Sequence, residues 1–310
     1  MRIVFFGSPD AALPSLQRLL EDGHSLELVV TQPDRPSGRG RAVAAGPVKR
    51  FAFERGIAVH QPEKIRTDPR SLELLRSIQP DIAVVVAFGQ ILPKAVIDLP
   101  RWHTVNVHFS LLPKYRGASP VAAALLRGEC RTGITIFELD EKMDEGPILA
   151  RREVDILPRE NAGGLEARLS RAGAELLSET LAARPSLPLI PQDHAAATYA
   201  PKLKKEDGRL IWSESASAVD LRVRAFTPAP SAFAFLAGRR LQVTQGRPAE
   251  GPAASGSPGR ILPAAPDGLP VCCGGETAYL IERLKPENKK EMSALEFVRG
   301  VRLSGDAVLE

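Results

Sequence analysis

Two polar side chains near the end of an apolar run are the first candidates for chemistry. Residues 105–113 read Val-Asn-Val-His-Phe-Ser-Leu-Leu-Pro, a β-branched stretch that continues into a turn. Side chains alternate along a strand, so Asn106 and His108 are expected on the same side. Ligands of open parallel sheets bind just beyond the carboxyl ends of strands. The pattern therefore predicts an amide and an imidazole facing a cleft; the alternative is a satisfied core histidine with a turn-capping asparagine.

A later loop rich in carboxylates supplies candidates for a third group. Residues 133–137 form a predicted strand, and the loop after it, 138–147, carries five acidic residues. If this strand lies beside the one that bears the imidazole, its loop covers the same cleft. The alternative is an ordinary solvated turn. The spacing leaves both Asp140 and Asp144 open as partners of the histidine.

The elements that must position these groups have the pattern of an α/β fold. Apolar runs at 3–6, 26–31 and 81–87 are predicted strands, and helical spacing of leucines separates the first two. A strand–helix–strand beginning predicts a parallel sheet. Gly7 ends the first strand, but no further glycine follows at the offsets of a dinucleotide fingerprint. We therefore expect neither NAD nor FAD, and a Rossmann-type oxidoreductase is disfavoured.

The second half of the chain follows a different pattern. Short β-rich pieces alternate with turns from about residue 208, which is typical of a small barrel. A proline-rich stretch precedes them and is expected to be an extended linker. The predicted organisation is a first domain at 1–184, a linker at 185–206 and a second domain at 207–310.

Composition places the chain among ordinary globular proteins. Its 310 residues are 44% hydrophobic and 25% charged, and no window approaches the length of a membrane span. The three cysteines, Cys130, Cys272 and Cys273, have neither disulfide-framework nor metal-ligand spacing. We therefore expect a cytoplasmic protein that needs no metal and acts as a monomer.

Basic residues gather in clusters, although the net charge is only +4. Arg35, Arg39 and Arg41 lie in a loop interrupted by proline and glycine, and Lys204 and Lys205 follow the linker prolines. Such clusters suit a polyanionic partner that is held through its phosphates. The alternative for each cluster is a solvated surface.

Several motifs together carry a family resemblance. Residues 106–113, followed by Tyr-Arg-Gly at 115–117, resemble the signature of folate-dependent formyltransferases. The loop at 32–40 and the segment at 202–212 extend the likeness, so the whole chain resembles the methionyl-tRNA formyltransferase family. The resemblance implies an α/β fold: a Rossmann-like parallel-sheet formyltransferase domain followed by a smaller C-terminal β-barrel, OB-like domain.

The resemblance also assigns roles to residues. It implies that Asn106, His108 and Asp144 are catalytic, which selects Asp144 over Asp140. The side chains expected at the folate and the residues expected at the tRNA come from the motif, the preceding loop and the basic clusters. The expected folate contacts are Phe88, Leu92, Ser110, Leu111, Leu112 and Pro113, and the expected tRNA contacts are Arg35, Arg39, Arg41, Lys204 and Lys205.

The implied reaction moves the formyl group of 10-formyltetrahydrofolate to the α-amino group of methionine on initiator tRNA. The amine would attack directly, Asn106 and His108 would stabilise the oxyanion, and Asp144 would orient the imidazole and a water. One alternative is a formyltransferase that acts on a small amine, such as a nucleotide sugar or glycinamide ribonucleotide. The other is a non-catalytic RNA-binding protein. The arginine loop and the basic second domain favour a tRNA substrate over a small amine.

Overall fold

The computed structural model forms two compact units. The first comprises Met1–Pro120, Arg131–Asp155 and Glu166–Ala200, and the second comprises Val121–Cys130, Ile156–Leu165 and Pro201–Glu310. The described residues are 1–36, 43–184, 186–250, 255–301, 304 and 306–310. Arg39 and Arg41 lie outside them.

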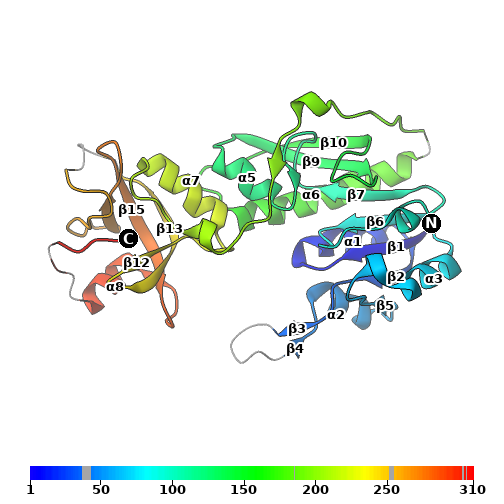
Figure 1. The fold of residues 1–310 in the computed structure, drawn as a ribbon, viewed down its shortest axis with the longest axis horizontal. Coiled ribbons are helices and arrows are strands. Elements are labelled where there is room, and N and C mark those ends of the chain that lie inside the picture. The colour runs from blue at the N-terminus through cyan, green and yellow to red at the C-terminus, as the bar shows by residue number, and fades with distance from the viewer. Residues whose placement is uncertain (37–42, 185, 251–254, 302–303, 305) are drawn as a thin grey trace. The chain divides into compact units, whose positions relative to one another are not determined.

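A seven-stranded sheet with the order β10-β9-β7-β6-β1-β2-β5 forms the first unit (Figure 1). Its strands are β1 (Arg2–Gly7), β2 (Ser25–Val30), β5 (Val59–His60), β6 (Ile82–Val86), β7 (Thr104–His108), β9 (Arg131–Glu138) and β10 (Ile148–Asp155). The five strands from β5 to β7 are parallel to one another, as predicted from the strand–helix–strand beginning. All five residues of β6 are buried, in keeping with its continuous apolar sequence.

The direction of β9 differs from the sequence expectation. It lies beside β7, as expected, but runs antiparallel to it, so Val105 pairs with Glu138 and His108 pairs with Thr135. The loop after β9 therefore starts beside the beginning of β7 and must double back to reach His108. Turn residues and periodicity carry no information about strand direction, which explains the difference.

Helices and short pairs complete the first unit. Prolines occupy the first turn of α1, α2 and α3, where a missing N–H breaks no helical hydrogen bond. Gly173 of α6 lies against Val107, Ile134 and Phe109, which brings this helix close to the sheet. The helices are α1 (Leu13–Glu21), α2 (Pro47–Glu54), α3 (Pro69–Ile78), α4 (Lys94–Ile97), α5 (Pro120–Leu126) and α6 (Ala162–Ala183), of which α5 belongs mainly to the second unit. The short pairs are β3 (Arg35–Pro36) with β4 (Val43–Ala44) and β8 (Arg116–Gly117) with β11 (Tyr199–Ala200).

The second unit is built on an antiparallel sheet with the order β12-β13-β15-β14. Single bridges join Leu236 to Leu309, Arg260 to Val308, and Ile261 to Val271. The segments at 308–309 and 260–261 thus join β12 at one edge of the sheet to β14 at the other edge, as expected of a barrel. The strands are β12 (Phe233–Leu236), β13 (Arg239–Pro248), β14 (Leu269–Cys272), β15 (Ala278–Pro286) and β16 (Met292–Ser293), and the helices are α7 (Ala216–Phe226) and α8 (Ala294–Gly300).

Two features of this unit depart from the sequence expectation. The first of the expected β-rich pieces, at 210–212, is no strand, because in the described part of this segment only Arg209 forms a bridge, to Phe233. Leu210 and Trp212 are nevertheless buried, whereas Ile211 is exposed. Helix α8 was not expected, although its Ser293 carries a complete capping box with Glu296. Within the described part of the chain, no helix combines the length and apolar content that crossing a membrane requires.

Candidate active site

Asn106 and His108 lie on the same side of β7, as the two-residue period predicts. His108 is buried, whereas Asn106 is only partly covered. No residue within the described ranges hydrogen-bonds the Asn106 side chain. Its amide is therefore available to a ligand, whereas the amide of a turn-capping asparagine would be engaged by the turn.

The His108 ring is oriented by a backbone carbonyl. Its Nε2 lies 3.0 Å from the carbonyl oxygen of Tyr115, and its Nδ1 lies 3.8 Å from Oδ2 of Asp144. A carbonyl oxygen can only accept, so Nε2 must carry the proton of this hydrogen bond. Nδ1 is consequently the nitrogen that remains for proton exchange, and it faces the carboxylate.

Asp144 reaches the histidine from the loop between β9 and β10. Its Oδ2 accepts a 2.7 Å hydrogen bond from the backbone N–H of Gly117, and its backbone has a left-handed φ of 54°. Asp140 instead caps a local turn, since its Oδ1 accepts from the N–H of Lys142 at 2.9 Å. The structure thus brings Asp144 to the imidazole and leaves Asp140 in the role of a turn residue.

The turn after β7 is fixed by a buried threonine on β9. The Thr135 hydroxyl donates to the carbonyl of Ser110 at 2.7 Å and accepts from the N–H of Leu112 at 3.0 Å. The Ser110 hydroxyl donates to the carbonyl of Lys114 at 2.6 Å, so it is engaged within the turn. The sequence reasoning missed Thr135, although a lone hydroxyl in an otherwise apolar predicted strand was a signal.

The remaining expected folate residues divide between core and surface. The side chains of Phe88 and Leu92 are buried in the core cluster, where Phe88 meets Phe6 edge-on at 5.4 Å between centroids. Leu112 packs in a second cluster with Phe137 and Ile148, while Leu111 and Pro113 are partly exposed. Phe88, Leu92 and Leu112 therefore belong to the hydrophobic core.

The exposed loop between β6 and α4 offers backbone groups instead. Ala87 and Gly89 have left-handed φ values of 48° and 78°, and both are exposed. The N–H groups of Gly89 and Ile91 donate to no acceptor among the described residues. Unpaired backbone donors in the loop that follows β6, the strand paired with β7, suit a planar heterocycle that is read by hydrogen bonds.

Two further polar residues join the site, and the sequence reasoning gave neither a role there. Arg116 is buried at 1% exposure, and Gln192 is buried at 6%. Arg116 stands in the Tyr-Arg-Gly motif, but Gln192 lies in the expected linker, where no periodicity or motif signals burial. Their hydrogen bonds connect the Asp144 loop to the segment before β11.

Those expected tRNA contacts that the structure describes lie on the surface. Arg35, Lys204 and Lys205 are exposed. Lys49, near the arginine loop, instead binds Asp34 at 2.5 Å, and its hydrogen bond holds the pKa of that carboxyl below its usual value, with Gln61 adding to the effect. Lys49 therefore anchors the base of the loop.

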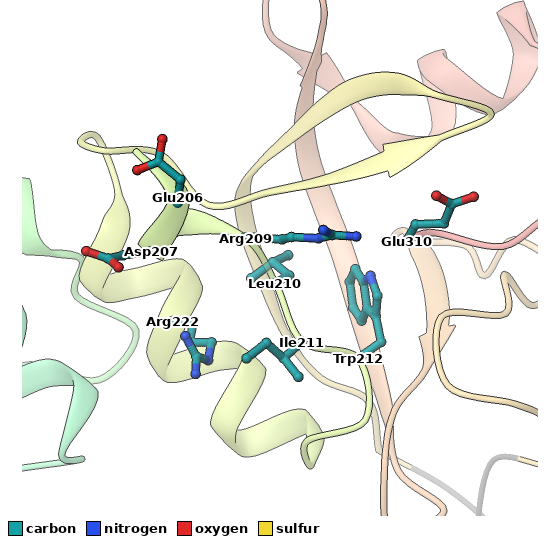
Figure 2. A pocket seen from close by; sticks show the side chains of 8 residues that line it. All are labelled: Glu206, Asp207, Arg209, Leu210, Ile211, Trp212, Arg222 and Glu310. Carbon is teal, nitrogen blue, oxygen red and sulfur yellow. The ribbon is translucent and has the colours of Figure 1, made fainter. Parts of the chain in front are cut away.

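An open pocket in the second unit does not have the charge that phosphate binding needs. Its volume is about 480 Å³, and Figure 2 shows the side chains that line it. One of its two arginines, Arg222, is already bound by Glu214 at 2.8 and 3.0 Å. Three acidic residues, Glu206, Asp207 and Glu310, also line it, so negative charges outnumber positive ones.

Comparison with known proteins identifies the family of this chain. Residues 1–181 match the formyl transferase family and residues 202–302 match the formyl transferase C-terminal domain. A methionyl-tRNA formyltransferase of Citrifermentans bemidjiense is 45% identical over 311 residues, covering 100% of this chain and 96% of the relative. The chain belongs to the methionyl-tRNA formyltransferase family. A member of this family from Bacillus subtilis is 41% identical, covering 99% of this chain and 97% of its own.

Solved structures share the fold at low sequence identity. HypX from Aquifex aeolicus in complex with tetrahydrofolic acid aligns with a TM-score of 0.65 at 18% identity, over 96% of this chain and 47% of that one. WlaRD, a sugar 3N-formyl transferase, aligns with a TM-score of 0.66 at 16% identity, over 94% of this chain and 99% of its own. This methionyl-tRNA formyltransferase family member therefore shares its fold with HypX and with a sugar formyltransferase.

Proposed function

We propose that this protein transfers a formyl group from 10-formyltetrahydrofolate to the α-amino group of methionine on initiator tRNA. The observation that carries the proposal is the placement of an unengaged Asn106 amide, the His108 imidazole and the Asp144 carboxylate together at the carboxyl end of β7. Membership of the methionyl-tRNA formyltransferase family supplies the substrate and the formyl donor.

Asn106 is the proposed oxyanion donor. A free α-amine has a pKa of about 8, and esterification of the carboxyl group lowers it, so much of the amine is neutral and can attack near pH 7. Attack on the formyl carbon produces a tetrahedral centre with a negatively charged oxygen. A preorganised amide N–H₂ stabilises that charge without reorganisation during the reaction.

His108 and Asp144 are proposed to manage the proton. The attacking amine must lose a proton, and the departing folate nitrogen must gain one. Because Nε2 of His108 is committed to the Tyr115 carbonyl, Nδ1 is the nitrogen that exchanges this proton. The 3.8 Å between Nδ1 and Asp144 leaves room for a water to bridge to the carboxylate as the ring changes charge.

The folate is proposed to bind between the loop after β6 and the turn after β7. Its formyl group is the one-carbon unit that is transferred. The N–H groups of Gly89 and Ile91 would bind the heterocycle, and Leu111 and Pro113 would contact it from the turn. Phe88, Leu92 and Leu112 would support these surfaces from the core.

The tRNA is proposed to contact both basic clusters. The catalytic domain would comprise 1–184 together with the part of the 185–206 segment that packs on it, and the tRNA-binding domain would span 207–310. Arg35, Arg39 and Arg41 would bind the acceptor end, and Lys204 and Lys205 would bind the phosphate backbone. Because these contacts are to phosphates, the affinity for tRNA should fall steeply as the salt concentration rises.

We propose that the enzyme acts as a monomer in the cytoplasm.

Formyl transfer to charged initiator tRNA tests the proposal. The same 10-formyltetrahydrofolate is offered with methionyl-tRNA, uncharged tRNA, free methionine and an amino-sugar nucleotide. The proposal expects transfer to methionyl-tRNA and far slower transfer to the other three. Faster transfer to the amino-sugar nucleotide would establish the small-amine alternative. Binding of tRNA without any transfer would establish a non-catalytic role.

A further inference from the structure

Gln192 lies in the expected linker, yet its side chain is buried within the proposed active site. Its carboxamide oxygen accepts hydrogen bonds from Nε and Nη2 of Arg116, at 3.2 and 2.8 Å. Its carboxamide nitrogen donates to the carbonyls of Asp144 and Gly146, at 2.9 and 2.8 Å. An amide offers two N–H donors and two lone pairs, and all four are used here.

The chemistry of its partners makes glutamine the matching side chain at this position. A guanidinium can only donate and a carbonyl can only accept, so the amide has one possible orientation between them. Glutamate would retain the acceptors for Arg116 but would present oxygen to the two carbonyls. Methionine would retain most of the volume but lose all four hydrogen bonds.

Arg116 gives Gln192 a fixed anchor. Its guanidinium is 1% exposed, and Nη1 lies 3.3 Å from Oε1 of Glu145. Nη2 lies 3.2 Å from Nδ1 of His194, and the Arg116 backbone N–H donates to the carbonyl of Thr198 at 2.8 Å. A buried charge is stable only when paired and hydrogen-bonded, so these contacts lock the guanidinium in place.

The amide therefore determines the backbone of the Asp144 loop. Asp144 has a φ of 54°, which costs energy and persists only where the surroundings enforce it. Gln192 holds its carbonyl while Gly117 holds its carboxylate, so the residue is fixed at both ends. We infer that Gln192 is a positioning residue that keeps the Asp144 carboxylate beside His108. The inference rests on the proposed function, because Asp144 must matter for positioning to matter.

Kinetics of Gln192→Met and Gln192→Glu test the inference. Both should lower kcat for formyl transfer by about tenfold or more, because small displacements of a catalytic group are costly. The KM values for folate and methionyl-tRNA should rise by a much smaller factor. Asp193→Asn is the matched control, since Asp193 is the exposed neighbour that caps the turn at His194–Ala196, and it should retain normal kinetics. If Gln192→Met fails to fold, Gln192→Glu keeps the acceptors for Arg116 and takes its place.

A double-mutant cycle separates positioning from a general structural role. If Gln192 acts through Asp144, adding Gln192→Met to Asp144→Ala should change kcat by less than about twofold, because coupled residues are non-additive. An undiminished loss in that background would overturn the positioning role while leaving the proposed function intact. Normal activity of Asp144→Ala alone would instead overturn the proposed role of Asp144, and the inference with it.

Discussion

His108 and Asp144 are held beside each other by separate backbone groups of one turn. The 3.8 Å between Nδ1 of His108 and Oδ2 of Asp144 is itself too long for a hydrogen bond. The carbonyl of Tyr115 accepts from the imidazole, and the N–H of Gly117 donates to the carboxylate. Tyr115 and Gly117 both have positive φ values, 61° and 115°. The shape of the turn at 115–117 thus determines the acid–base geometry.

Gly117→Ala should disrupt this geometry. A Cβ at Gly117 would lie 2.6 Å from the carbonyl oxygen of Ala200, and the left-handed backbone would be strained as well. We expect lower thermal stability and a loss of formyl transfer. Gly23→Ala is the control, because Gly23 also has a positive φ of 77° but, its chain neighbours aside, no atom of the described residues lies within 4 Å of its added Cβ. It should lose roughly 1 kcal/mol of stability and no activity. Equal activity of the two variants would contradict the role of the turn.

Asn106→Ala should reduce catalysis without affecting folding. Removing one oxyanion donor costs roughly 3 kcal/mol of transition-state stabilisation, so kcat should fall on the order of a hundredfold or more. The midpoint temperature of thermal unfolding should be nearly unchanged, since no described residue forms a hydrogen bond with the Asn106 side chain. Asn106→Asp keeps the shape but removes the donor, and it should be equally impaired. An Asn106→Asp enzyme with normal turnover would exclude the oxyanion role.

Thr135→Val should destabilise the protein by about 1–3 kcal/mol, because the carbonyl of Ser110 and the N–H of Leu112 lose their partner. Thr132 on the same strand is the control. Its hydroxyl is also buried but has no hydrogen-bond partner among the described residues, so Thr132→Val should be neutral or stabilising. Denaturant unfolding of the two variants measures the difference, and similar losses would argue against the role of Thr135.

Arg39→Ala should weaken the use of tRNA far more than the binding of folate. A loop arginine that contacts phosphate contributes mainly to tRNA affinity, and the salt dependence of binding should become shallower. Steady-state kinetics with each substrate varied in turn, at two salt concentrations, provides the measurement. An equal loss for both substrates would exclude this role for the arginine loop.

The three thiols should differ in reactivity. Burial raises the pKa of Cys273 to about 12, whereas Cys130 is exposed. A thiol reagent at pH 8 should therefore modify one cysteine in the native protein and all three in denaturant, because the thiolate is the reactive form. Between the usual thiol value of 9.0 and 12, the unfolded state releases the proton first, so stability should fall as the pH rises. The decline should be smaller in Cys273→Ala, which has no thiol to titrate there.

Much of the fold follows from local sequence. Apolar runs locate β1, β2, β6 and β9 to within about two residues, because a strand buried on both faces is apolar along its whole length. Helix α1 lies between β1 and β2, where the leucine spacing predicts it. Helix α8 was missed because only seven residues carry its pattern, although the cap at Ser293 marks its start.

The site was harder to predict because its parts are distant in the chain. The two-residue spacing places Asn106 and His108 together, but Asp144 reaches them only through a loop that doubles back after antiparallel β9. Gln192 and Thr198 contribute through contacts with Arg116 and Tyr115 that no periodicity encodes. Non-local pairing of this kind leaves no mark in a single sequence.

The segment leading to β11 has a consequence for dissection of the molecule. Gln192, Thr198 and Ala200 each hydrogen-bond the stretch between Pro113 and Ser119 or the Asp144 loop. A fragment cut at residue 184 would keep every proposed catalytic side chain but lose these hydrogen bonds. The shortest autonomous enzyme core should therefore end at or beyond Ala200.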